Sequence, residues 1–195
     1  LRGMRDRNGI GPLATPADTR ANYRKGVQKV PLALARTELA TIAAINGHAI
    51  GLGCDLASLC DMRVASDQAK FAASFVKIGI VPGDGGAWIL PRAIGAARAA
   101  EMILTGDTIS AAEAHRFGLV SEIMPPEQVL PAARALAERV AANPPRSVRL
   151  AKRLLIEARH ARLAARRQAL SHRLCQQHYR RPRRAAPQAA ARRLL

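Results

Sequence analysis

The glycine-rich segment at residues 46–55 constrains the fold more than any other part of this sequence. An apolar, partly β-branched run at residues 41–45 precedes it, and residues at helical spacing follow it before a second apolar run at residues 61–65. This order predicts a strand, a glycine turn, a helix and another strand. Such a turn permits unusual backbone angles and directs the first helical amides outward, where they can bind an anion or a developing oxyanion.

A second glycine-rich corner, at residues 82–86, contains another acidic residue. Residues 71–81 before it are apolar and strand-like, and the residues after it, including Trp88, have a helical pattern. Asp84 therefore lies at a turn of the same kind as the one that contains Asp55. The chain thus offers two carboxyl groups at glycine-rich turns.

The rest of the pattern alternates helices with short strands. With one Trp, two Tyr and three Phe in 195 residues, the core must be built mainly from Ala, Leu, Ile and Val, which suit packed sheets and helices. Ser110 and Glu113 have the spacing of a capping box. We therefore expect an α/β protein. The other expected elements are helices at residues 18–30, 95–104, 111–117, 126–142 and 147–172, and a strand at residues 119–124.

Cysteine usage and hydropathy indicate the compartment. Cys54, Cys60 and Cys175 are odd in number and lack the spacing of a metal site, which favours a reducing setting. The apolar stretches are interrupted well before the roughly 18 residues of a membrane-spanning helix, and the start has no signal-peptide pattern. We expect a cytoplasmic protein with no membrane partner and no metal.

Several motifs together resemble one known family. Residues 42–57, followed by residues 60–65 and 79–86, closely resemble the signature of the enoyl-CoA hydratase/isomerase (crotonase) superfamily. The resemblance extends over roughly residues 40–160. It implies an α/β fold in which ββα units form a spiral, followed by a C-terminal helical region. It also implies an acyl-CoA thioester substrate and a homo-oligomer, either a trimer or a hexamer.

The resemblance also suggests how the chain is divided. We expect an N-terminally incomplete spiral core at residues 1–142, a C-terminal helical region at residues 143–178, and a basic, disordered tail at residues 179–195. The family binds the thioester carbonyl between two backbone amides. By analogy one of them is the amide of Leu52, and the other would lie just upstream of Leu1. The substrate-contact residues implied by the resemblance are Leu1, Arg2, Gly51, Gly53, Phe75 and Pro82.

The catalytic residues implied by the resemblance depart from those of a hydratase. Asp55 stands at the first of two glutamate positions, and Phe75, which cannot move a proton, stands at the second. Asp84 matches a third acidic position that certain double-bond isomerases use. Asp55 and Asp84 could therefore move protons on an enoyl thioester. No cofactor is expected, because coenzyme A is part of the substrate.

Each of these residues also has a simpler interpretation. Asp55 and Asp84 could be carboxylates that only stabilise the start of a helix. His48 is more typical of a polar turn, and Cys54 of a small packed residue. The chain as a whole could be a catalytically impaired or inactive relative that at most binds acyl-CoA or partner subunits.

The net charge of +17 is concentrated at the C-terminal end. Residues 146–195 contain 15 Lys and Arg but one acidic residue, Glu157. Three interpretations are open: nucleic-acid binding, attraction of coenzyme A phosphates, and an altered reading frame with nonspecific polyanion affinity. Because no aromatic residues are interleaved with the arginines, we expect no dedicated nucleic-acid site.

Overall fold

The computed structural model describes residues 15–160 of the 195-residue chain. Contacts divide the chain into two compact units, with the boundary between Lys152 and Arg153. Within residues 15–160, no helix is both long enough and apolar enough to cross a membrane. The predicted domain boundary at residue 142 stays a prediction, and the predicted basic tail lies outside the described residues.

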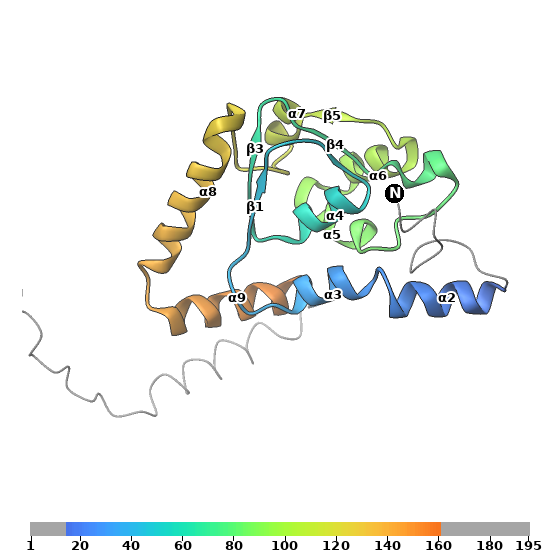
Figure 1. Cartoon of the computed structure of the whole chain (residues 1–195), viewed down its shortest axis with the longest axis horizontal. Coiled ribbons are helices and arrows are strands. Elements are labelled where there is room, and N and C mark those ends of the chain that lie inside the picture. The colour runs from blue at the N-terminus through green and yellow to red at the C-terminus, as the bar shows by residue number, and fades with distance from the viewer. Residues whose placement is uncertain (1–14, 161–195) are drawn as a thin grey trace, which may run out of the picture. The chain divides into compact units, whose positions relative to one another are not determined.

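The described part of the chain alternates helices with short strands (Figure 1). The elements in chain order are α2 (Pro16–Lys25), α3 (Lys29–Arg36), β1 (Ile42–Ile45), β2 (Ala49–Ile50), α4 (Leu52–Leu59), β3 (Met62–Ser66), β4 (Lys70–Ala72), the 3-10 helix η1 (Ser74–Ile78), α5 (Gly86–Ile94), α6 (Ala96–Thr105), β5 (Ile109–Ser110), α7 (Ala111–Arg116), β6 (Glu122–Met124), α8 (Pro126–Ala141) and α9 (Pro145–His160).

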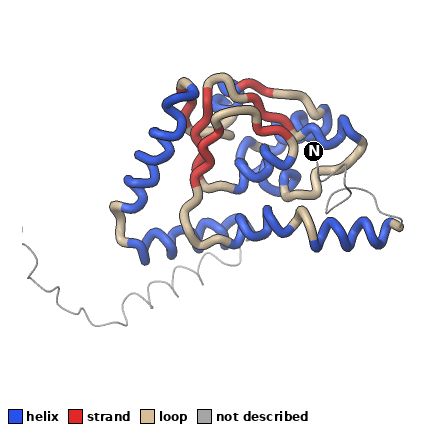
Figure 2. The backbone as a smooth tube through the Cα atoms, in the orientation of Figure 1, coloured by secondary structure: helices blue, strands red, loops and turns tan. Residues whose placement is uncertain are grey.

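The strands form two small sheets (Figure 2). In the first sheet β3 lies between β1 and β6 and is parallel to both, with Ile42 opposite Met62 and Val64 opposite Glu122. In the second sheet β4 lies between β2, to which it is parallel, and β5, to which it is antiparallel. Helix α8 packs on the first sheet through Val129, which lies with Val64 in a small apolar cluster.

The strand, turn, helix and strand predicted around residues 41–65 are confirmed. The turn closes at Gly51, whose φ of 57° falls in the region that favours glycine. Its amide donates to the carbonyl of Ala72 on β4 (2.8 Å), which joins the start of α4 to the second sheet. One face of α4 is buried in the main core, where Cys54 of α4 and Leu90 of α5 are both fully buried.

The predicted capping box is also present. The Ser110 hydroxyl accepts from the Glu113 amide (3.2 Å), and the Glu113 carboxylate accepts from the Ser110 amide (2.9 Å). Helix α6 ends before Gly106, whose φ of 68° gives the left-handed stop expected there. Helices predicted at residues 95–104, 111–117 and 126–142 are therefore confirmed to within a residue or two.

Three predicted elements were wrong in extent. The strand predicted at residues 119–124 forms only over Glu122–Met124, where it pairs with the end of β3. Residues 71–81 do not form one strand, because β4 pairs only with two-residue strands and ends at Ala72; the chain then turns through η1 to Gly79. The helix predicted at residues 18–30 is interrupted at Gly26, where α2 ends and a turn leads to α3. Helix α9 begins at Pro145, and the predicted part beyond His160 lies outside the described residues.

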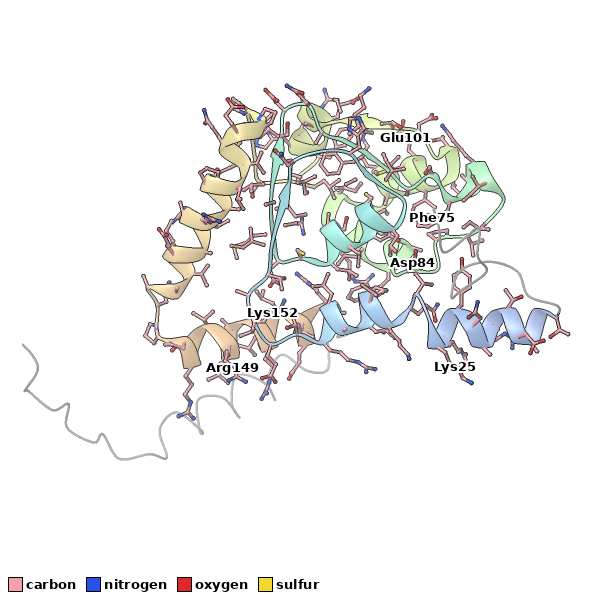
Figure 3. The ribbon with its side chains drawn as sticks, viewed as in Figure 1. Lys25, Phe75, Asp84, Glu101, Arg149 and Lys152 are labelled. Atoms are coloured by element: carbon pink, nitrogen blue, oxygen red, sulfur yellow. The ribbon has the colours of Figure 1, made fainter. Side chains whose placement is uncertain are left out.

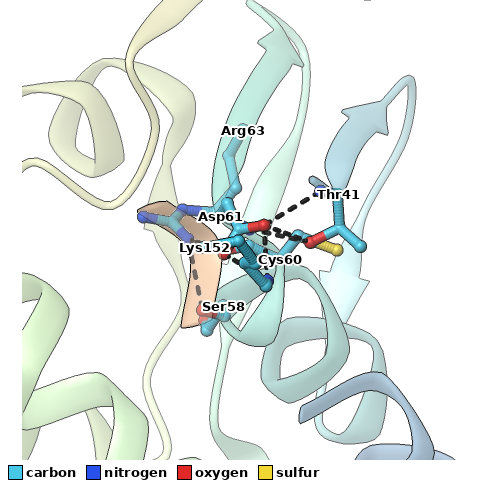
Figure 4. A network of polar contacts seen from close by, with 6 residues as sticks. All are labelled: Thr41, Ser58, Cys60, Asp61, Arg63 and Lys152. Carbon is cyan, nitrogen blue, oxygen red and sulfur yellow. Dashed lines mark hydrogen bonds and ion pairs between the residues drawn. The ribbon is translucent and has the colours of Figure 1, made fainter. Parts of the chain in front are cut away.

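A buried ion pair joins the first turns of α9 to the end of the first sheet (Figure 4). The ammonium of Lys152 lies 2.5 Å from both carboxylate oxygens of Asp61, and the Lys152 side chain is only 4% exposed. The same carboxylate accepts from the amide (2.9 Å) and the hydroxyl (3.0 Å) of Thr41. The Asp61 charge is thereby compensated by one cation and two further hydrogen bonds.

Candidate functional site

The start of α4 presents backbone amides at the glycine turn. Leu52 is the first helical residue, so its amide is among the N-terminal donors that the helix itself cannot pair. Gly51, at the N-cap, carries no side chain that could cover this amide. The turn therefore leaves backbone amides available to a ligand. The role of the Leu52 amide as an oxyanion donor stays a prediction.

Asp55 lies one turn further along α4 and is completely buried. One of its carboxylate oxygens, Oδ2, accepts from the amide of Gly86 at 3.1 Å. The other oxygen, Oδ1, is buried and has no hydrogen-bond partner among the described residues. A buried oxygen without a partner is costly in a side chain that only supports a helix, so this arrangement favours a functional role.

Asp84 lies in the second corner, just before α5 (Figure 3). Its side chain is buried, with 6% exposed. Its Oδ1 atom is also buried without a partner among the described residues. Burial, and secondly the negative charge of Asp84, raise the pKa of Asp55 to about 7, although the Gly86 hydrogen bond opposes this rise. Burial also raises the pKa of Asp84. The structure thus places the two predicted carboxyls near enough for the charge of Asp84 to act on Asp55.

Gly86 permits this arrangement because it has no side chain. A Cβ atom at this position would overlap Oδ1 of Asp55. The backbone of the second corner therefore approaches the Asp55 carboxyl as closely as only glycine allows. The Gly85-Gly86 pair was the signal available in the sequence, but its role as a contact with Asp55 was not predicted.

Phe75 provides an apolar side chain beside the glycine turn. It lies on η1, is 8% exposed, and its ring would be 3.7 Å from a Cβ atom placed on Gly51. Of the other predicted contact residues, Gly53 lies in the first turn of α4 and Pro82 is half-buried before the second corner. Leu1 and Arg2 lie outside the described residues.

The simpler interpretations of His48 and Cys54 agree with the structure. His48 is exposed in the turn between β1 and β2. Burial, and secondly the charge of Asp55, raise the pKa of the Cys54 thiol to about 12, so this residue carries no thiolate near neutral pH. Among residues 15–160, no three His, Cys, Asp or Glu side chains gather as they would around a metal ion.

Two residues near Asp84 were not identified from the sequence. The Gln28 side-chain amide donates to the carbonyl of Gly83 at 2.9 Å. The ring of Tyr23 lies on the side of Gly83 where a side chain would project, with its Cε1 atom 3.7 Å from the position that a Cβ atom would take. Both belong to a polar N-terminal stretch, in which no motif distinguishes them from their neighbours.

Comparison with protein families shows the family of this chain. Residues 12–186, most of the chain, match the family model described as enoyl-CoA hydratase/isomerase. The chain belongs to the enoyl-CoA hydratase/isomerase family. The resemblance to the crotonase superfamily is thereby confirmed, and the two carboxyls and the glycine turn lie inside the matched region.

Curated relatives are named as hydratases. The chain is 47% identical to a probable enoyl-CoA hydratase of Mycobacterium bovis over 119 residues, which are 61% of this chain and 46% of the relative. It is 43% identical to a crotonyl-CoA hydratase of Syntrophomonas wolfei over 125 residues, which are 64% of this chain and 48% of the relative. The chain therefore spans about half the length of the curated relatives that it matches.

Solved structures of the family share the fold. A probable enoyl-CoA hydratase/isomerase of Mycobacterium abscessus superposes with a TM-score of 0.77 and 37% identity, over 87% of this chain and 65% of the other. A monofunctional enoyl-CoA isomerase of M. smegmatis superposes with a TM-score of 0.66 and 40% identity, over 71% of this chain and 65% of the other. The predicted α/β crotonase-like fold is confirmed.

Proposed function

We propose that the chain acts on enoyl-CoA thioesters and moves protons on a thioester enolate by means of Asp55 and Asp84. The observation that carries this proposal is the pair of buried carboxyls, each with an oxygen that has no partner among the described residues. They lie beside a helix start whose amides are available to a ligand. The proposed reaction needs no cofactor, because coenzyme A arrives with the substrate.

The Leu52 amide is proposed to donate to the thioester carbonyl oxygen. When a proton leaves the carbon next to that carbonyl, the electron pair of the C–H bond moves into the enolate and the oxygen becomes negative. A fixed backbone donor stabilises this charge more strongly in the transition state than in the substrate. The N-cap at Gly51 supports this role, because it makes no side-chain hydrogen bond that would occupy a first-turn amide.

Asp55 is proposed as the group that accepts the proton. A carboxyl with a pKa of about 7 is partly ionised at neutral pH and still basic enough to take a proton from carbon. Returning that proton to a carbon two positions away, by Asp55 or through Asp84, shifts the double bond without consuming any other reactant. The pair can therefore catalyse an isomerisation.

Phe75 favours isomerisation over hydration in this proposal. Hydration requires a water molecule held by two acid or base groups, and Phe75 stands where the family resemblance expects the second of them. Its buried ring lies beside the turn at Gly51 and offers no hydrogen bond to water. Double-bond isomerisation is therefore the reaction that this site supports best.

The proposal is tested with two thioesters. A 3-enoyl-CoA should be converted to the conjugated 2-enoyl-CoA, which is followed by the ultraviolet absorbance of the conjugated thioester. Crotonyl-CoA should lose that absorbance more slowly, because it must be hydrated. Calorimetric titration with a short acyl-CoA measures binding separately. Binding without either reaction would favour a catalytically inactive relative, and the absence of binding would refute the proposal. A homo-oligomer and a cytoplasmic location remain predictions.

The isomerisation rate is expected to rise with pH around neutrality. Only the ionised form of Asp55 can accept a proton, and its raised pKa of about 7 means that this form is scarce below pH 6 and dominant above pH 8. The kcat for the 3-enoyl thioester should therefore increase through a midpoint near pH 7. A midpoint near pH 4, the ordinary value of a carboxyl, would show that the base does not have the raised pKa expected of the buried Asp55.

Phe75→Glu is expected to raise hydration relative to isomerisation. The new carboxyl would lie beside Gly51 and could hold and activate a water molecule, which the phenyl ring cannot do. The ratio of the two rates should change by about tenfold or more. Phe117→Glu, at the end of α7, is the control and should leave the ratio unchanged. An unchanged ratio in Phe75→Glu would separate residue 75 from the reaction.

A further inference from the structure

The corner that contains Asp84 has almost no side chains of its own to hold it. Gly83 precedes Asp84, and Gly85 and Gly86 follow it; Gly85 has a φ of 105°. Glycine loses more conformational freedom on folding than any other residue. The position of the Asp84 carboxyl must therefore be fixed by contacts that come from other elements.

Two hydrogen bonds anchor the corner on either side of Asp84. On one side, the Gly86 amide donates to Asp55 on α4 at 3.1 Å. On the other side, the Gly83 carbonyl accepts from the side chain of Gln28 at 2.9 Å, across 55 positions of the chain. Asp84 thus lies between one anchor on α4 and one in the turn between α2 and α3.

The turn that carries the second anchor is itself well supported. The backbone amide of Gln28 donates to the Tyr23 carbonyl at 3.2 Å, and the backbone amide of Gly26 donates to the Asn22 carbonyl at 2.7 Å. The Tyr23 ring lies beside Gly83, 3.7 Å from where a Cβ atom on Gly83 would be. The backbone hydrogen bond between Gln28 and Tyr23 therefore joins the two residues that lie against this corner.

The electrostatic surroundings of Asp84 come from three elements. The negative charge of Asp84 contributes to the raised pKa of Asp55 on α4. Tyr23 on α2 is a neutral phenol, because burial and secondly the charge of Asp84 raise its pKa above the usual value. Gln28 contributes a neutral amide. A shift of the corner toward solvent would therefore weaken both the burial of Asp84 and its repulsion with Asp55.

We infer that Gln28 and Tyr23 are positioning residues that hold the Asp84 carboxyl in register with Asp55. The turn between α2 and α3 fixes Gly83, and the fixed corner keeps Asp84 buried beside the proton-accepting group. This inference rests on the proposed function for its catalytic consequence, but the structural part of it can be measured without any substrate.

The structural test follows the aspartate carboxyls by carbon-13 NMR in the full chain across a pH titration. Gln28→Leu keeps the approximate volume of the side chain and removes the donor to Gly83. The titration midpoints of Asp55 and Asp84 should both fall toward the ordinary value, because Asp84 becomes hydrated and moves away from Asp55. Gln128→Leu, at an exposed position on α8, should leave both midpoints unchanged. Unchanged midpoints in Gln28→Leu would overturn the inference.

The catalytic test measures kcat and KM for the 3-enoyl thioester. Displacement of Asp84 should lower kcat on the order of tenfold to a hundredfold, while KM changes less than about twofold. Tyr23→Phe keeps the ring contact and should have little effect, whereas Tyr23→Ala should resemble Gln28→Leu and serves as the second variant if Gln28→Leu does not fold. An inactive parent chain would refute the proposed function alone, since the NMR titration would still test the anchor. Equal kcat in the parent and both anchor variants would overturn the catalytic part.

Discussion

Asp55→Asn is expected to reduce turnover of a 3-enoyl-CoA thioester by about 10³-fold or more. Asparagine has nearly the same shape and can still accept from the Gly86 amide, but it cannot take a proton, and general acid–base catalysis typically contributes about 10²–10⁴-fold. Because the Leu52 amide is untouched, binding of acyl-CoA should remain within a few-fold of the parent. Stopped-flow absorbance and calorimetric titration measure the two quantities.

The control for this substitution is Asp67→Asn. Asp67 is exposed in the turn after β3, so the same chemical change there should leave turnover unaltered. Full activity in Asp55→Asn would remove the proposed mechanism. Loss of both turnover and acyl-CoA binding would instead show that Asp55 is needed to shape the site.

Lys152→Ala is expected to lower the free energy of unfolding by about 3–5 kcal/mol, because it removes the ammonium that pairs with the buried carboxylate of Asp61. Thr41 would still donate two hydrogen bonds to the Asp61 carboxylate, but these donors are uncharged and do not replace the ammonium at 2.5 Å. Equilibrium denaturation in urea, followed by circular dichroism, measures the change.

Arg149→Ala is the matched control on the same helix. Its guanidinium pairs with Glu38 at 2.7 Å, but the two side chains are 60% and 40% exposed, so water solvates and screens both charges. Removing such a pair should cost less than about 1 kcal/mol. Equal losses in Lys152→Ala and Arg149→Ala would mean that burial of the Asp61 pair contributes no special stability.

The sequence contained the parts of the fold that depend on local pattern. The apolar run at residues 41–45, the turn at Gly51 and the capping box of Ser110 with Glu113 were each predicted, because periodicity, glycine and hydroxyl spacing act within a few residues. The extent of the segment at residues 71–81 was not, because the end of a strand depends on the length of its distant partners.

In the candidate site, too, only the residues that belong to a local motif were predicted from the sequence. Asp55 and Asp84 were identified because each lies in a recognisable motif. Their proximity in the structure could not be predicted from local pattern, because the two motifs lie far apart in the sequence. Gln28 and Tyr23 act through a backbone carbonyl and a ring edge, and neither contact requires a distinctive residue type or spacing. Lys152 was part of an expected amphipathic helix, where its burial could not be distinguished from solvation.

The Asp61–Lys152 pair also has a consequence for the order of events during protein synthesis. Asp61 meets Thr41 across 20 positions, and Arg63 meets Ser121 across 58, but Lys152 lies 91 positions after Asp61. At about 5–20 residues added per second, the ribosome needs roughly 5 to 20 seconds to extend the chain from Asp61 to Lys152. During that interval the Asp61 carboxylate has no partner ammonium from α9, so we expect this end of the first sheet to stay open to water until translation has passed residue 152.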